Sequence, residues 1–160
     1  MNWPLEINSF LSELESAQEN AMAVLKRKQE MLASADVEGM KAIAEEEKTA
    51  VDRLDACLKR RESLLRTAAL TGMPSDSIEQ LCRSLPKETG LNERIRRSIQ
   101  RTRSIQFQSL TNWVLAQRSV LHLNQLLEMI EFKGALAPTY GRDKKKESGN
   151  GGGNLVDRVA

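Results

Sequence analysis

Apolar residues recur at three- and four-residue steps through most of the first 133 residues, and this is the spacing of one face of an α-helix. The first such stripe begins after Pro4, a residue that the first turn of a helix tolerates, and ends near Ser34. Its members are Ile7, Phe10, Leu11, Leu14, Ala17, Ala21, Val24 and Met31. The stripe predicts one long amphipathic helix.

A second helix is predicted over residues 36–70, with Asp36 as its N-terminal cap. Its expected packing stripe is interrupted by Glu47 and Arg61 and consists of Val37, Met40, Ala44, Val51, Leu54, Leu58 and Leu65. Because only the short junction ASAD separates the two helices, we expect them to form an antiparallel hairpin.

The stretch TGMPSDSIEQL interrupts the helical pattern. Gly72 is typical of a helix C-terminus, Pro74 breaks the helix, and Ser75 or Asp76 can cap a new one. A short third helix is therefore predicted over residues 76–84.

The last predicted helix runs from Leu91 to about Lys133. Its expected packing stripe is Ile95, Ile99, Thr102, Leu110, Trp113, Ala116, Val120, Leu123, Leu127 and Ile130. After residue 109 a second apolar set lies on other sides of the same helix: Leu110, Val114, Leu121, Leu126 and Met129. A helix this apolar around its circumference is buried on several sides or offers a face to a partner.

These elements predict an all-α fold: an elongated antiparallel helical hairpin, a short helix and a long C-terminal helix, in a coiled-coil-like bundle. We expect a helical bundle domain over residues 1–133 and a flexible Gly/Lys-rich tail over residues 134–160. The tail contains GNGGG, typical of a flexible linker, and ends in an apolar patch made by Leu155, Val156 and Val159. No run of roughly 20 apolar residues and no secretory leader is evident, so a cytoplasmic location is expected.

Charge is distributed unevenly along the chain, although the formal net charge is only +2. Residues 1–56 carry 6 Lys/Arg and 12 Asp/Glu, whereas residues 87–118 carry 7 Lys/Arg and 2 Asp/Glu. The simplest interpretation is an acidic hairpin that lies beside a basic helix and reduces its self-repulsion.

The sequence offers little for catalysis or metal binding. His122 is the single histidine and lies between two leucines without a close acidic neighbour. No nucleophile, phosphate-binding or zinc motif is present, and Cys57 and Cys82 fit buried thiols inside helices. We therefore expect no enzyme activity, no cofactor and no metal.

The stretch NERIRRSIQRTRS keeps nucleic-acid binding open as an alternative, because arginines contact phosphates. Arg94, Arg97 and Arg101 share one side of the helix while Arg96 and Arg103 share another, and no aromatic residue lies among them to stack bases. A structural coiled-coil adaptor that self-associates is a second alternative.

The stretch EMLASADVEGMKAIAEEEKTAVDRLDACLKRRESLL resembles the helical hairpin of the FlgN family. The positions that carry the resemblance are Glu30, Leu32, Asp36, Lys48, Leu54, Arg61, Glu62, Leu64 and Leu65. The later stretches NQLLEMI and PTYGRD and the terminus LVDRVA are also similar to that family, whereas the Gly-rich spacer after Gly141 departs from it.

The resemblance implies a cytoplasmic chaperone of flagellar type III export. Such a protein binds the C-terminal amphipathic helices of flagellar hook-associated proteins, prevents their premature assembly and delivers them to the flagellar export apparatus. A client helix would lie in an apolar groove, for which the candidates are Leu110, Trp113, Val114, Leu121 and Leu126. The tail candidates, which would cover the empty groove or contact the export machinery, are Tyr140, Leu155, Val156 and Val159.

Overall fold

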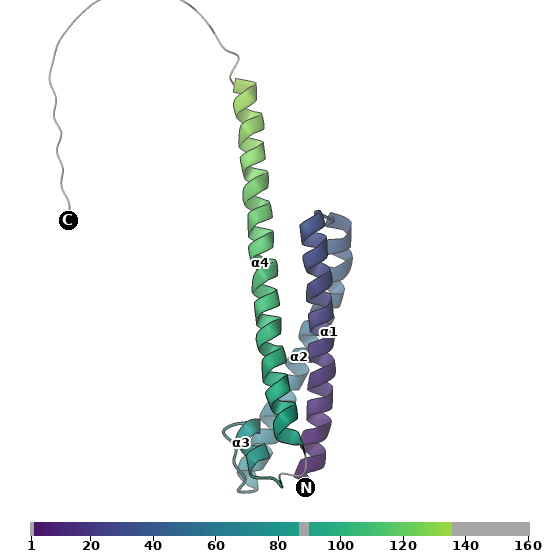
Figure 1. The fold of residues 1–160 in the computed structure, drawn as a ribbon, viewed down its shortest axis with the longest axis vertical. Helices are drawn as coiled ribbons and strands as arrows, with labels where there is room; N and C mark the ends of the chain where they lie inside the picture. Colours follow the sequence, from purple (N-terminus) through teal and green to yellow (C-terminus); the bar gives the residue numbers. More distant parts are fainter. Residues whose placement is uncertain (1, 87–89, 136–160) are drawn as a thin grey trace, which may run out of the picture. The chain divides into compact units, whose positions relative to one another are not determined.

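A computed structural model describes residues 2–86 and 90–135 of the chain, which form helices and the turns between them. The chain divides into two compact units, Met1–Leu123 and Asn124–Ala160. The first unit holds α1, α2, α3 and the first part of α4 (Figure 1). The all-α fold predicted from the sequence is confirmed. The predicted boundary between residues 133 and 134 stays a prediction.

Helices α1 (Trp3–Ser34) and α2 (Val37–Leu70) form the expected antiparallel hairpin, which Figure 1 shows as two adjacent helices joined by a tight turn. Ala35 ends α1 in the left-handed conformation, with φ of 54°. The Asp36 carboxylate then caps α2 by accepting a hydrogen bond from the Gly39 N–H at 2.9 Å. The capping role predicted for Asp36 is confirmed, because a side-chain oxygen here satisfies an N–H that has no partner within the helix.

The packing stripe of α1 is the predicted one, whereas the stripe predicted for α2 is only partly right. Leu54 and Leu65 pack against the core, but in place of Ala44, Val51 and Leu58 the preceding residue is the buried one. The side of α2 that packs on α1 is formed by Ile43, Ala50, Cys57, Leu64 and Ala68, all buried. Val51 and Leu58, which the prediction placed in the core, are 58% and 49% exposed. The small side chains of Ala50 and Cys57 suit a close approach of the two helices, so at these two positions the smaller of two adjacent residues faces inward.

Helix α3 (Ile78–Arg83) closes one end of the core with Ile78, Leu81 and Cys82. Its cap is Ser77, whose hydroxyl accepts from the Gln80 N–H at 3.1 Å, rather than the predicted Ser75 or Asp76. Ser77 has the extended backbone that an N-cap requires. Gly72 has a φ of 71°, which confirms the helix stop predicted there.

Helix α4 (Leu91–Ala135) begins in the same core, where Leu91 and Ile95 are buried. It runs parallel to α1, because Arg94 contacts Ser12 and Asn112 contacts Leu25 further along both helices. Among residues 2–86 and 90–135, no helix combines the length and the apolar character that crossing a bilayer would need.

Candidate functional site

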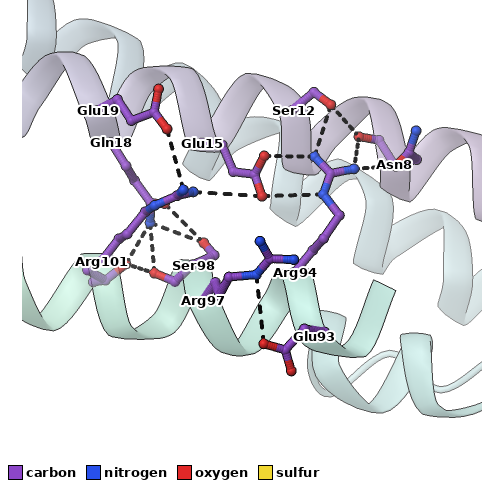
Figure 2. A network of polar contacts seen from close by, with 11 residues as sticks. Asn8, Ser12, Glu15, Gln18, Glu19, Glu93, Arg94, Arg97, Ser98 and Arg101 are labelled. Atoms are coloured by element: carbon purple, nitrogen blue, oxygen red, sulfur yellow. Dashed lines mark hydrogen bonds and ion pairs between the residues drawn. The ribbon is translucent and has the colours of Figure 1, made fainter. Parts of the chain in front are cut away.

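The acidic side of α1 and the basic start of α4 meet at Glu15, which lies between Arg94 and Arg101 (Figure 2). Arg94 donates through Nη2 to Glu15 Oε2 at 2.9 Å and through Nε to Oε1 at 3.3 Å. Arg101 Nη2 lies 3.4 Å from Glu19 Oε1. The hydrogen bond from Arg94 is the main reason that the pKa of Glu15 is lowered. The predicted pairing of an acidic hairpin with a basic helix is confirmed.

Ion pairs within the chain also bear on whether the arginine-rich stretch is free to bind nucleic acid. Arg96 and Arg97 lie 3.9 and 3.8 Å from oxygens of Glu93. Together with Arg94 and Arg101, four of the five arginines between residues 94 and 103 therefore have a carboxylate partner in the part of the chain that the structure describes. A phosphate backbone would have to compete with these carboxylates.

Side-chain amides continue the contact between α1 and α4 (Figure 2). The buried Gln18 donates through Nε2 to the Ser98 carbonyl at 3.0 Å and to the Thr102 hydroxyl at 2.9 Å. Further along, Gln108 donates to Gln29 Oε1 at 2.8 Å. Sequence reasoning missed these groups because it counted only apolar positions. Ala17 belongs to the α1 stripe, so the position of Gln18 directly after it could have indicated a buried amide.

The side chains of α4 leave the core after Asn112, whose amide donates to the Leu25 carbonyl at 2.8 Å. From residue 113 to residue 123 no side chain is buried. Trp113, Val120 and Leu123, which were predicted to pack in the bundle, are instead 60%, 52% and 58% exposed. The prediction failed because the helical stripe outlasts the contacts with α1, and periodicity does not reveal where a neighbouring helix stops covering it.

Five of the exposed apolar residues of α4 lie on one side of the helix. Trp113 and Val114 precede Gln117 by four and three residues, and Val120 and Leu121 follow it by three and four. In a helix with about 3.6 residues per turn, these four positions surround the central residue. We call this surface the α4 face and define it as Leu110, Trp113, Val114, Gln117, Val120 and Leu121, all of them exposed.

The structure thus brings together four of the five residues predicted to form a groove: Leu110, Trp113, Val114 and Leu121. The fifth, Leu126, is also exposed but belongs to the second compact unit, so we leave it out of the α4 face. The predicted tail residues Tyr140, Leu155, Val156 and Val159 lie outside the described residues.

The chemistry of the α4 face is that of non-covalent docking. From residue 104 to residue 123 the helix carries a single charged residue, Arg118. No cluster of metal-ligating side chains occurs within the described ranges 2–86 and 90–130. The two cysteines are buried elsewhere, and burial raises the pKa of Cys82 to about 11. The expectation of buried thiols is confirmed.

These features define an all-α protein in which a helical hairpin holds the start of a long helix and leaves an apolar face of that helix uncovered. The model of the family described as FlgN protein matches residues 3–148, and the chain belongs to this family. The family is one of flagellar export chaperones, and this general role applies to the chain. Neither the curated proteins nor the solved structures gave a significant match.

Proposed function

We propose that the chain is a cytoplasmic export chaperone that binds the C-terminal amphipathic helices of flagellar hook-associated proteins on the α4 face. It keeps these helices from assembling early and delivers the client to the flagellar export apparatus. The observation that supports this role is the joint exposure of Leu110, Trp113, Val114 and Leu121 in a family of export chaperones. An apolar helix face of this kind is the surface on which an amphipathic client helix docks.

The α4 face is a better docking surface than the other exposed apolar residues. Val37, Val51, Leu58 and Leu70 are also exposed, but they lie seven or more residues apart along α2. On α4, in contrast, five exposed apolar side chains lie within a stretch of twelve residues and on the same side of the helix. A stable protein–protein contact buries about 800 Å² on each partner, which requires such a contiguous surface.

The first test is co-purification of the full chain with hook-associated proteins, with and without their C-terminal helices. We expect a stable complex that is lost when the client helix is removed. The double variant Val114→Ser/Leu121→Ser should weaken the complex at least tenfold, because it removes two exposed apolar contacts from the α4 face.

A matched control is the double variant Val51→Ser/Leu58→Ser, which changes two exposed apolar residues at the same seven-residue spacing on α2. It should bind the client as the unaltered chain does. Equal loss in both double variants, or full binding of a client that lacks its C-terminal helix, would contradict the proposed site.

For the tail we propose a role that follows from its apolar residues Tyr140, Leu155, Val156 and Val159. Removal of residues 136–160 leaves α4 complete and tests two versions of this role. If the tail covers the empty α4 face, client affinity rises on removal; if the tail contacts the export apparatus, affinity stays constant and export falls. Unchanged affinity together with unchanged export would leave the tail without a role.

A further inference from the structure

The position of Gln117 is unusual for a docking surface. Its side chain is exposed in the middle of four exposed apolar residues, Trp113, Val114, Val120 and Leu121. It makes no hydrogen bond within the part of the chain that the structure describes. When two helices pack, a side chain of one helix enters the space between four residues of the other. Gln117 would be one of the α4 residues that contact a docked helix in this way.

Docking a helix on the α4 face would therefore bury an amide. A buried amide without a hydrogen-bond partner weakens binding, and a buried charge that is not paired weakens it more. The apolar neighbours of Gln117 offer its amide no hydrogen-bond partner, so the partner helix has to supply one.

A second glutamine extends the pattern. Gln106 lies eleven residues before Gln117, which is about three helical turns, and it is also exposed. The two amides thus share one side of α4. Over residues 104–123 the only charged residue is Arg118, which lies about 100° around the helix from Gln117 and outside the α4 face. The face itself therefore carries no charged side chain to neutralise a charge on the partner.

We infer that the helix bound by the α4 face is uncharged on its contacting side and carries an amide or hydroxyl side chain that pairs with Gln117. This inference rests on the proposed function, because it specifies the chemistry of the client helix that docks there. A single polar position within an apolar helix interface fixes the register of the two helices at some cost in affinity. Gln117 accordingly selects the register and rejects helices with a charge at the matching position.

The test uses three synthetic amphipathic peptides of three leucine-rich heptads, identical except for Gln, Leu or Glu at the central position. Their affinities for the full chain are measured by titration calorimetry. We expect the Gln peptide to bind at least tenfold more tightly than the Glu peptide. The affinity of the Gln peptide should change less than about threefold between 50 and 500 mM salt, because uncharged contacts are not screened.

The variant Gln117→Leu should bind the Leu peptide more tightly than the unaltered chain does, and it should lose its preference for Gln over Leu. The matched control is Gln100→Leu, the same change at an exposed position of α4 outside the α4 face. It should keep the peptide preference of the unaltered chain.

The outcomes separate this inference from the proposed function. Binding of a hook-associated client through Val114 and Leu121, with equal affinity for the Gln and Glu peptides, would overturn the inference and leave the proposed function standing. Failure of every client to bind would reject both. Concentration-dependent dimers that disappear in Val114→Ser/Leu121→Ser would show that a second copy occupies the face, and the inference would again be wrong.

Discussion

Arg94 on α4 holds Glu15 on α1, 79 residues earlier in the chain, through a hydrogen-bonded ion pair with a 2.9 Å distance between Nη2 and Oε2. Both side chains are largely shielded, at 21% and 25% exposure, so water weakens this pair less than a surface pair. The pair, with Arg101 on the other side of Glu15, holds the start of α4 against the hairpin, whereas the side chains of residues 113–123 are not buried.

The pH dependence of folding should reveal this pair. Because the pKa of Glu15 is lowered in the folded chain, mainly by the Arg94 hydrogen bond, its contribution to stability is present above the unfolded value of about 4.3. The contribution is lost as the pH falls through the lower folded pKa. We expect Glu15→Gln to reduce the free energy of unfolding by about 1 kcal/mol at pH 7.

Urea unfolding of both proteins at pH 7 and near pH 3 measures the effect, and the difference should shrink at the lower pH. The control Glu38→Gln alters an exposed carboxylate that pairs with Lys41 three residues away, and it should change stability little. A Glu15→Gln difference of the same size at both pH values would contradict the assignment.

Gln18 should be the most sensitive polar residue of the α1–α4 contact. It is 2% exposed, and its amide nitrogen donates to oxygens of Ser98 and Thr102. Gln18→Leu keeps the volume but removes these hydrogen bonds, so we expect a loss of about 1–3 kcal/mol in chemical denaturation. The exposed Gln100→Leu should change stability by less than about 0.5 kcal/mol. Equal effects of the two changes would show that the buried amide does not stabilise the contact.

The two tryptophans should behave in opposite ways. Trp3 is 8% exposed and packs in the core, whereas Trp113 is 60% exposed on the α4 face. Trp3→Ala should cost about 3–5 kcal/mol of stability. Trp113→Ala should leave the free energy of unfolding almost unchanged while it weakens client binding. A large loss of stability from Trp113→Ala would place that side chain in the core, contrary to the structure.

Both cysteines should be protected from thiol reagents in the folded chain. Burial raises the pKa of Cys57 and raises that of Cys82 to about 11, so little thiolate is present at pH 8. We expect labelling by a thiol-specific reagent to be slow for both residues and to become rapid in denaturant. Cys57→Ser and Cys82→Ser, labelled separately, identify which thiol reacts first. Rapid labelling of either residue in the native protein would mean that its helix opens locally.

Local signals in the sequence were sufficient to place the helices. Pro4, Asp36 and Gly72 each mark a helix end through a backbone or capping preference that does not depend on the rest of the fold. The apolar surplus after residue 109 indicated that α4 is either buried on several sides or offers a face to a partner, because one packing stripe does not need so many apolar residues. The structure leaves these residues exposed.

What the sequence could not predict depends on contacts between helices. Val51 and Leu58 are more hydrophobic than Ala50 and Cys57, yet the smaller pair faces α1. Hydrophobicity alone favours Val51 and Leu58 here. The distance between two packed helices depends on the side chains of both, so it cannot be predicted from the stripe of one helix. The burial of Gln18 was missed for the same reason: its partners Ser98 and Thr102 lie in another helix about 80 residues away.

The two-residue junction between α1 and α2 also sets an order of assembly. Ala35 and Asp36 bring the helices of the hairpin together across a very short loop, whereas Gln18 and Leu25 find their α4 partners 80 and 87 residues later. Closing a long loop costs more chain entropy than closing a short one. We therefore expect the hairpin to form before α4 packs on it, so that the residues of the α4 face are synthesised after a hairpin that can already hold the start of their helix.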